Sequence, residues 1–324
     1  MSTEISFMTF SPDRRRNFLA AIAVCLFISA VSAQETSRPK PRFTAEELNH
    51  WAYQAPEKPD VRAVSDPAWQ VNAIDAFVLA KLTEAGLAPA APATPHALVR
   101  RVYYDLTGLP PSPEEVTAFV ADPSSEAYAA LVDRLLDSPH YGEKWGRLWL
   151  DVVRYADSNG YERDSDKPYM WRYRDYVIDS FNQDKPYDQF IMEQLAGDEL
   201  DEVTPDSLVA TGFYRLHVWD DEPADPLQAR YDNLDDVVAT TAETFLASTV
   251  GCARCHNHKI DPISQRDYYS FLAFFENISP IVRDGAPRSI LTPDEQAAYD
   301  AALRDKEQRM NLAREALFTF ESTF

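Results

Sequence analysis

The chain of 324 residues has little glycine: nine glycines stand against 23 prolines. An all-β chain with many left-handed turns usually needs more glycine, so we expect helices joined by stiff connections. Strand-like alternation is scarce, and no unit of roughly 20–50 residues repeats, which argues against a solenoid. The expected fold class is all-α: an irregular multi-helix domain with long ordered loops. No Ser-His-Asp triad, phosphate loop or dinucleotide fingerprint is visible.

Basic residues are also few. Lysine and arginine total 31 against 52 aspartates and glutamates, which gives a formal net charge of −21. Such a charge repels a phosphate backbone, so we expect no nucleic-acid partner. It suits cationic ligands, divalent metals or basic proteins, and it also serves simply to keep an exported protein soluble.

Long apolar runs are absent except for residues 18–31, which follow Arg14, Arg15 and Arg16 and end near the small residue Ala33. This pattern predicts a secretory signal peptide over residues 1–33, with cleavage after Ala33. The run is shorter than the ~20 residues that span a bilayer. We therefore expect an exported protein, periplasmic or extracellular, with no transmembrane segment in the mature chain.

The remainder divides by composition into three parts. Residues 34–70 are rich in proline and predict an extended arm whose aromatic residues dock onto the body. Residues 71–285 carry dense helix signals, such as the Ser112 to Glu115 capping box, and form the expected helical domain. Residues 286–324 predict an exposed C-terminal helix, interpreted as a truncated linker.

Cysteine is the scarcest informative residue. Cys25 leaves with the signal peptide, so the mature chain keeps Cys252 and Cys255, followed by His256. This C-x-x-C-H spacing lets two thiols add to the vinyl groups of a single haem c while the histidine ligates the iron. A long helix from Leu227 runs toward the motif, and we expect Gly251 to turn the backbone off its end.

Alternatives for this motif stay open. Cys252, Cys255, His256, His258 and Asp261 form a compact ligand set that zinc or iron would accept. A thioredoxin-like redox pair usually lies at a helix start after a strand, whereas this pair follows a helix. A structural disulfide would close too small a loop to gain much entropy.

Acidic side chains gather in a second segment. Asp220, Asp221, Glu222 and Asp225 could surround Ca²⁺ or another divalent metal, which binds through oxygen ligands. A solvated acidic loop is the alternative interpretation. Asp157, Asn159, Glu162 and Asp164 are a weaker version of the same idea.

As a pattern, the chain resembles the planctomycete-type cytochrome c-like domain of unknown function. The matching segments are residues 50–52, 72–78, 105–111, 138–145, 154–161, 171–175, 194–198, 210–213, 220–225 and 252–262. The resemblance implies an exported cytochrome-like module. It also implies a second planctomycete-specific domain, expected here on another chain, as an alternative partner to a separate redox protein.

The sixth haem ligand has several candidates. His217 precedes a segment that matches the family and is favoured on that ground, while Met170, Met192 and His140 are others. An open sixth position is equally compatible with the sequence. The expected function is periplasmic electron transfer, or a part in a haem-dependent oxidoreductase. The alternatives are a metalloprotein, hydrolytic in one version, built on the Cys252–Asp261 cluster, and a structural module of an exported complex.

Overall fold

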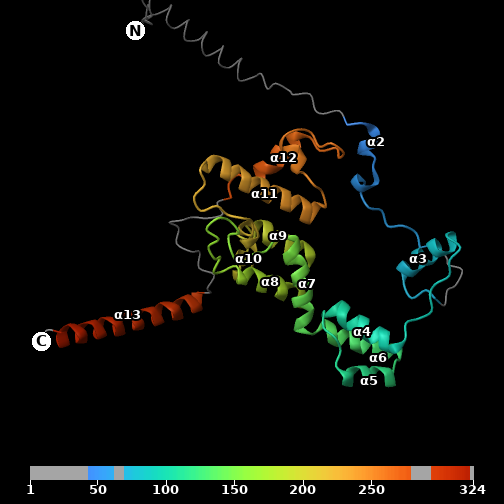
Figure 1. Ribbon diagram of the computed structural model, residues 1–324, viewed down its shortest axis with the longest axis horizontal. Helices are drawn as coiled ribbons and strands as arrows, with labels where there is room; N and C mark the ends of the chain where they lie inside the picture. Colours follow the sequence, from blue (N-terminus) through green and yellow to red (C-terminus); the bar gives the residue numbers. More distant parts are fainter. Residues whose placement is uncertain (1–42, 62–68, 279–292, 322–324) are drawn as a thin grey trace, which may run out of the picture. The chain divides into compact units, whose positions relative to one another are not determined.

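The computed structural model describes residues 43–61, 69–278 and 293–321 (Figure 1). Throughout these ranges the chain is helical or irregular, without a strand, and the one β-bridge joins Ser158 to Asp166. The all-α prediction is confirmed. The predicted signal peptide lies outside the described residues. No helix within the described ranges is long and apolar enough to span a bilayer.

The α-helices, in chain order, are α2 (Ala45–Leu48), α3 (Ala73–Glu84), α4 (Pro95–Leu106), α5 (Pro113–Ala121), α6 (Ser125–Leu136), α7 (Pro139–Val152), α8 (Trp171–Asn182), α9 (Tyr187–Ala196), α10 (Pro205–Ala210), α11 (Pro226–Leu246), α12 (Gln265–Leu272) and α13 (Pro293–Glu321). The described ranges also contain four 3₁₀ turns: η1 (Trp51–Tyr53), η2 (Thr211–Arg215), η3 (Gly251–Arg254) and η4 (Ala273–Phe275). Most of these helices begin at a capping side chain. The predicted box at the start of α5 is present, with Glu115 N donating to Ser112 Oγ and Ser112 N donating to Glu115.

Two glycines set the close packing of α7 against α8, which run beside each other (Figure 1). A Cβ placed on Gly142 would lie 2.4 Å from the carbonyl oxygen of Ile178, and one on Gly146 would lie 3.1 Å from the Ile178 side chain. Gly142 N also donates to Asn182 Oδ1. The spacing of four residues places both glycines on one face of α7, so the helix backbones approach closely.

Among the residues that the structure describes, buried apolar side chains form three clusters. One lies among α4, α5 and α6, and a second among α7–α10 and η2. The third joins α11, η3, α12 and η4, the segment that carries the C-x-x-C-H motif. Tyr214 packs against both the second and the third cluster, and its hydroxyl donates to the Leu195 carbonyl.

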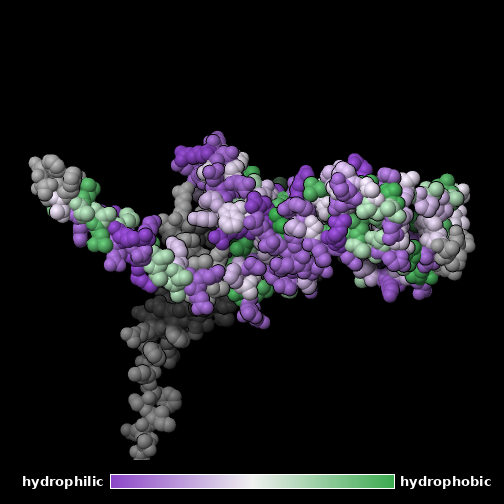
Figure 2. Space-filling model, turned by 90° about the horizontal axis from the view of Figure 1, so that it is seen from below, coloured by the Kyte–Doolittle hydropathy of each residue, from purple (hydrophilic) through white to green (hydrophobic). Residues whose placement is uncertain are grey.

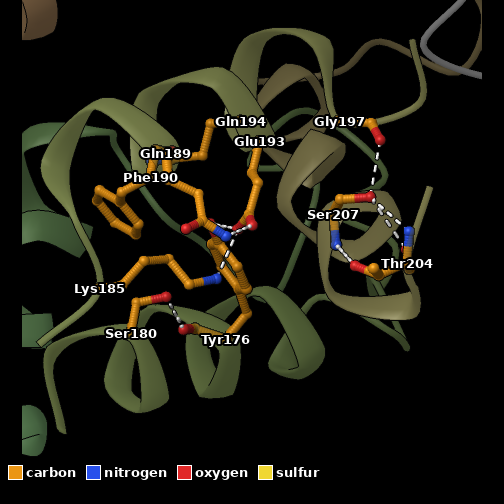
Figure 3. Close-up of polar contacts among 10 residues, drawn as sticks. All are labelled: Tyr176, Ser180, Lys185, Gln189, Phe190, Glu193, Gln194, Gly197, Thr204 and Ser207. Atoms are coloured by element: carbon orange, nitrogen blue, oxygen red, sulfur yellow. Dashed lines mark hydrogen bonds and ion pairs between the residues drawn. The ribbon is translucent and has the colours of Figure 1, made fainter. Parts of the chain in front are cut away.

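A buried ion pair links α9 to the turn that precedes it. Figure 3 shows the side chains of Lys185, Tyr176 and Gln189 converging on Glu193. The Lys185 and Glu193 side chains are only 11% and 5% exposed. Burial raises the pKa of Glu193, but the hydrogen bonds from Lys185, Tyr176 and Gln189 outweigh it, so the pKa is lowered and the carboxylate stays charged.

The arm differs from the sequence expectation. Of the described residues, 43–56 and 260–262 form one compact unit and the others a second. Within the first unit Thr44 caps α2 and η1 follows, so this stretch is partly helical where an extended chain was expected. Trp51 is 81% exposed, and the Tyr53 hydroxyl donates to Asp261 of the same unit at 2.9 Å.

The C-terminal helix α13 lies within residues 286–324, for which the sequence predicts an exposed helix. Its described side chains are mostly exposed, including Phe318. In Figure 2 hydrophilic and hydrophobic residues both lie on its surface.

Candidate functional site

The C-x-x-C-H motif follows the C-terminal end of α11. This helix ends as Ala247 adopts a left-handed backbone, with φ 49°, and Ser248 N donates to the Ala242 carbonyl at 3.1 Å. The expectation that Gly251 makes this turn is wrong. Gly251 is not left-handed, and a Cβ there would meet open space. The chain has already turned four residues earlier, and Gly251 simply begins η3.

Buried apolar residues anchor the backbone of the motif. Ala253, between the two cysteines, is 0% exposed, and Val250 is also buried. Both pack in the cluster that includes Val237 of α11 and Tyr268 of α12. Because Ala253 points into the core, the turn exposes the side chains of Cys252 and Cys255.

Arg254 anchors the same turn through ion pairs. Its guanidinium donates to Asp232 and, at 2.9 Å, to Asp235, both on α11. The Tyr268 hydroxyl donates to Asp235 as well. From α12, Tyr269 Oη and Gln265 Nε2 both donate to the Arg254 carbonyl at 3.1 Å. The motif is therefore fixed to two helices by contacts that use neither thiol.

Cys252 and Cys255 are both exposed, and their thiols are not joined in a disulfide. His256 is exposed too, and its amide donates to the Cys252 carbonyl at 3.4 Å. The His256 ring places Nδ1 2.7 Å from the Asn257 carbonyl oxygen. A carbonyl only accepts, so Nδ1 is the donor in this contact, and Nε2 is the ring nitrogen through which the neutral side chain would bind a metal.

The other residues of the predicted metal cluster have separate contacts. His258 N donates to the Ile263 carbonyl at 2.8 Å, and Asp261 accepts from Tyr53. Nowhere in the described ranges do three or more His, Cys, Asp or Glu side chains lie as a metal ion would need. The metal prediction for Cys252 to Asp261 therefore stays a prediction.

The acidic segment is tied to its surroundings by hydrogen bonds. Asp220 accepts from the Glu222 amide, Glu222 pairs with Arg163 at 2.7 Å, and Ser165 Oγ donates to Asp221. Asp225 caps α11 by accepting from the Leu227 and Gln228 amides. The calcium prediction for these four residues likewise remains a prediction.

His217 is the most buried of the candidate ligands, at 2% exposure. Its Nδ1 lies 3.0 Å from the Tyr214 carbonyl oxygen, so Nδ1 carries the proton, and Nε2 is buried without a hydrogen-bond partner among the described residues. A cavity of about 510 Å³ is lined by His217 together with Asp220, Asp221 and Glu222. Cys252, Cys255 and His256 do not line this cavity.

Positive charge surrounds His217. Burial is the largest cause that lowers its pKa, to about 4, with Arg154, Arg215 and Lys167 acting in the same direction and Asp236 opposing them. Lys167 Nζ donates to the carbonyls of Leu216 and His217. His217 is therefore a neutral hydrogen-bond acceptor at pH 7.

The remaining predicted sixth ligands occupy ordinary positions. Met170 is buried in the cluster of α7–α10, whereas Met192 is exposed. His140 Nδ1 lies 2.7 Å from a Glu143 carboxylate oxygen on the same helix.

The sequence did not reveal the residues that position the C-x-x-C-H turn and those that surround His217. Asp232 and Asp235 lie three residues apart on one helix face, a spacing that could have suggested a shared partner such as Arg254. The ion pair of Arg154 with Asp236 joins residues distant in sequence, and no local signal marks it. Asn159, whose Oδ1 accepts from Arg215 at 2.6 Å, was considered only as a calcium ligand.

The described residues thus form an all-α domain whose long helix α11 leads into an anchored, exposed C-x-x-C-H turn. Residues 73–280 match the family described as "PSCyt2: Protein of unknown function (DUF1549)", and the chain belongs to this family. No curated protein and no solved structure matches the chain.

Proposed function

We propose that this protein is a c-type cytochrome-like electron carrier that holds a single haem covalently through Cys252 and Cys255. His256 is the proximal ligand. The observation that carries the proposal is the anchored turn: two unpaired, exposed thiols and a histidine with Nε2 available lie on a backbone fixed by Ala253 and Arg254.

The donor set suits haem c. Two thiols at this spacing can form thioether bonds, and a neutral imidazole that donates through Nδ1 to a carbonyl is the usual state of a ligating histidine. When bound, the haem supplies one-electron transfer at its iron. The protein's own part is to orient His256 through Asn257 and to hold the turn on α11 and α12.

The exposure of Cys252, Cys255 and His256 favours electron exchange with a partner protein at this surface. Attachment of haem also needs export, and the predicted signal peptide would meet that condition. The partner would be a separate redox protein or the companion domain on another chain.

The test is a haem stain of the full chain after denaturing electrophoresis, with expression in a periplasm that contains the c-type maturation system. We expect a stained band that is absent in Cys252→Ala/Cys255→Ala and retained in His258→Ala. Unstained wild type beside a stained control cytochrome would refute the proposal. Zinc or iron found in that colourless protein, and lost in both variants, would support the metalloprotein alternative.

A further inference from the structure

The cavity that His217 lines is formed by α11 and by the segment that leads into this helix. Its lining residues on α11 recur at helical spacing and so share one face: Pro226, Ala229, Arg230, Asn233, Leu234 and Val237. Residues 214–223 supply most of the remaining lining, including the rings of Tyr214 and Trp219. The volume of about 510 Å³ lies in the range of small-molecule sites. Nε2 of His217 is enclosed, so a ligand must find its polar partners elsewhere in the lining.

Burial divides the lining into an apolar inner part and a polar outer part. Leu234 and Val237 are only 5% and 3% exposed. Asp220 and Asp221 are half-buried, and Glu222 is exposed. A ligand would therefore place an apolar group against α11 and a polar group toward the carboxylates.

Carboxylates outnumber cations in this lining. Its acidic members are Asp220, Asp221 and Glu222. Arg230 is the one cation among the described lining residues, and its guanidinium pairs with Glu276 at 2.8 Å. The lining therefore carries an excess of negative charge.

Other cations near the lining are engaged with the protein itself. Arg163 pairs with Glu222 at 2.7 Å, and Arg154 pairs with Asp236. Lys167 Nζ donates to two backbone carbonyls. None of these three cations lines the cavity, so a ligand inside it meets the carboxylates instead.

The least compensated of the carboxylates is Asp220. Arg215 lies over the Trp219 ring, 5.2 Å from its centroid, and interacts electrostatically with Asp221 without lining the cavity. Asp220 takes part in no ion pair within the part of the chain that the structure describes, and it accepts a hydrogen bond from the Glu222 amide. Asp220 is therefore the carboxylate that a cationic ligand would stabilise most.

The arrangement suits an organic cation better than a metal ion. The three carboxylates do not converge as metal ligands, since the described ranges contain no group of three or more His, Cys, Asp or Glu side chains placed to hold one. Calcium needs six to eight oxygen ligands, whereas an ammonium group can donate to a single carboxylate. The buried aliphatic side chains of α11 offer a metal ion nothing, but they favour a carbon skeleton.

We infer that this cavity binds a small organic cation: a primary ammonium group carried on an apolar body, such as a phenyl ring. The ammonium donates to Asp220 at the outer end, and the apolar body lies against Leu234 and Val237. The site is independent of the proposed haem attachment, because the thiols and the histidine of the C-x-x-C-H turn do not line the cavity.

The test is a calorimetric titration of the full chain with phenethylamine and with phenethyl alcohol, which has the same carbon skeleton without the charge. We expect the amine to bind about tenfold more tightly, as a hydrogen bond between charged groups predicts. The advantage of the amine should shrink at high salt, because the carboxylates are partly exposed.

Asp220→Asn removes the charge but keeps an oxygen to accept from the Glu222 amide. In this variant the two probes should bind with similar affinity, and the affinity for phenethyl alcohol should equal that of wild type. Asp225→Asn is the matched control. It removes a charge from the same segment outside the lining, and it should keep the preference for the amine.

A second pair of variants tests the cavity itself. Ala229 lines the cavity, and Ala229→Phe should fill it and abolish binding of both probes. Ala224→Phe, at an exposed position outside the lining, should bind them as wild type does. Equal affinity for the two probes in wild type, an unchanged preference in Asp220→Asn, or no binding of phenethylamine would each overturn the inference.

Discussion

His256 and His217 both place Nδ1 against a backbone carbonyl, of Asn257 and Tyr214 respectively, and so both keep Nε2 as the acceptor nitrogen. Their surroundings differ. His256 lies exposed on a turn that is held by α11 and α12, whereas His217 is buried and is influenced by three cations and by Asp236. An exposed imidazole beside two thiols leaves room for a large planar group. The buried imidazole of His217, whose Nε2 is enclosed, leaves no such room.

The comparison also predicts which substitutions lower the free energy of unfolding. Where the changed group is buried, its partners lose a contact that water cannot replace, and the free energy of unfolding falls. Where the changed group is exposed, its chemical function is lost but the free energy of unfolding hardly changes. Four predictions test this gradient, from the largest expected effect to the smallest.

The largest loss of stability is expected at the buried ion pair between Lys185 and Glu193 of α9. Lys185→Met leaves the Glu193 carboxylate buried without its cation and should lower the free energy of unfolding by about 3–5 kcal/mol. Lys81→Met, which breaks the exposed pair with Glu84, is the control and should cost within about 0.5 kcal/mol. Urea unfolding measures both, and equal losses would contradict the burial argument.

The second prediction concerns pH and His217. Its folded pKa of about 4 lies below the unfolded value of 6.5, so the unfolded chain binds more protons between these values. The free energy of unfolding should therefore be fully retained above pH 6.5 and fall toward pH 4, by up to about 3 kcal/mol from this group. His217→Phe should flatten that part of the profile. An identical profile in wild type and variant would show that His217 is not held neutral.

A smaller loss is expected when the motif's anchor is removed. Arg254→Ala frees Asp232 and Asp235 of α11 from their shared partner, and partly exposed charges should cost about 1–2 kcal/mol. Because the turn is then less fixed, the haem-stained band should weaken. Arg266→Ala, at an exposed position of α12, is the matched control. Full stability and full staining in Arg254→Ala would show that the anchor has no such role.

The smallest change in stability is expected at the thiols themselves. In protein made without the haem maturation system, Cys252→Ala/Cys255→Ala should unfold within about 0.5 kcal/mol of wild type, because both side chains are exposed. A loss of several kcal/mol, measured by the same urea titration, would mean that the cysteines serve the fold.

Much of the helical fold could be predicted from local signals. The box from Ser112 to Glu115 predicted a helix start that the structure contains. Such signals depend on a few neighbouring residues and need no tertiary information. The end of α11 was mispredicted because Ala247, which gives no sequence signal for a left-handed turn, takes the role expected of Gly251.

Only part of the candidate site could be predicted, because some of its residues are linked by local spacing and others only by the fold. The C-x-x-C-H spacing is local, so the sequence indicated both thiols and His256. The contacts of Arg254 with α11, and the cations around His217, join residues far apart in the chain. The sequence placed His217 beside the acidic segment, but neither its burial nor its unpaired Nε2 could be derived without the fold.

The central claim is the covalent haem at Cys252 and Cys255, and the most direct measurement is a pyridine haemochrome spectrum of the purified mature chain from a periplasm that matures c-type cytochromes. The account predicts a c-type α band that persists after denaturation and disappears in Cys252→Ala/Cys255→Ala. A colourless protein from cells that mature a control cytochrome would contradict it.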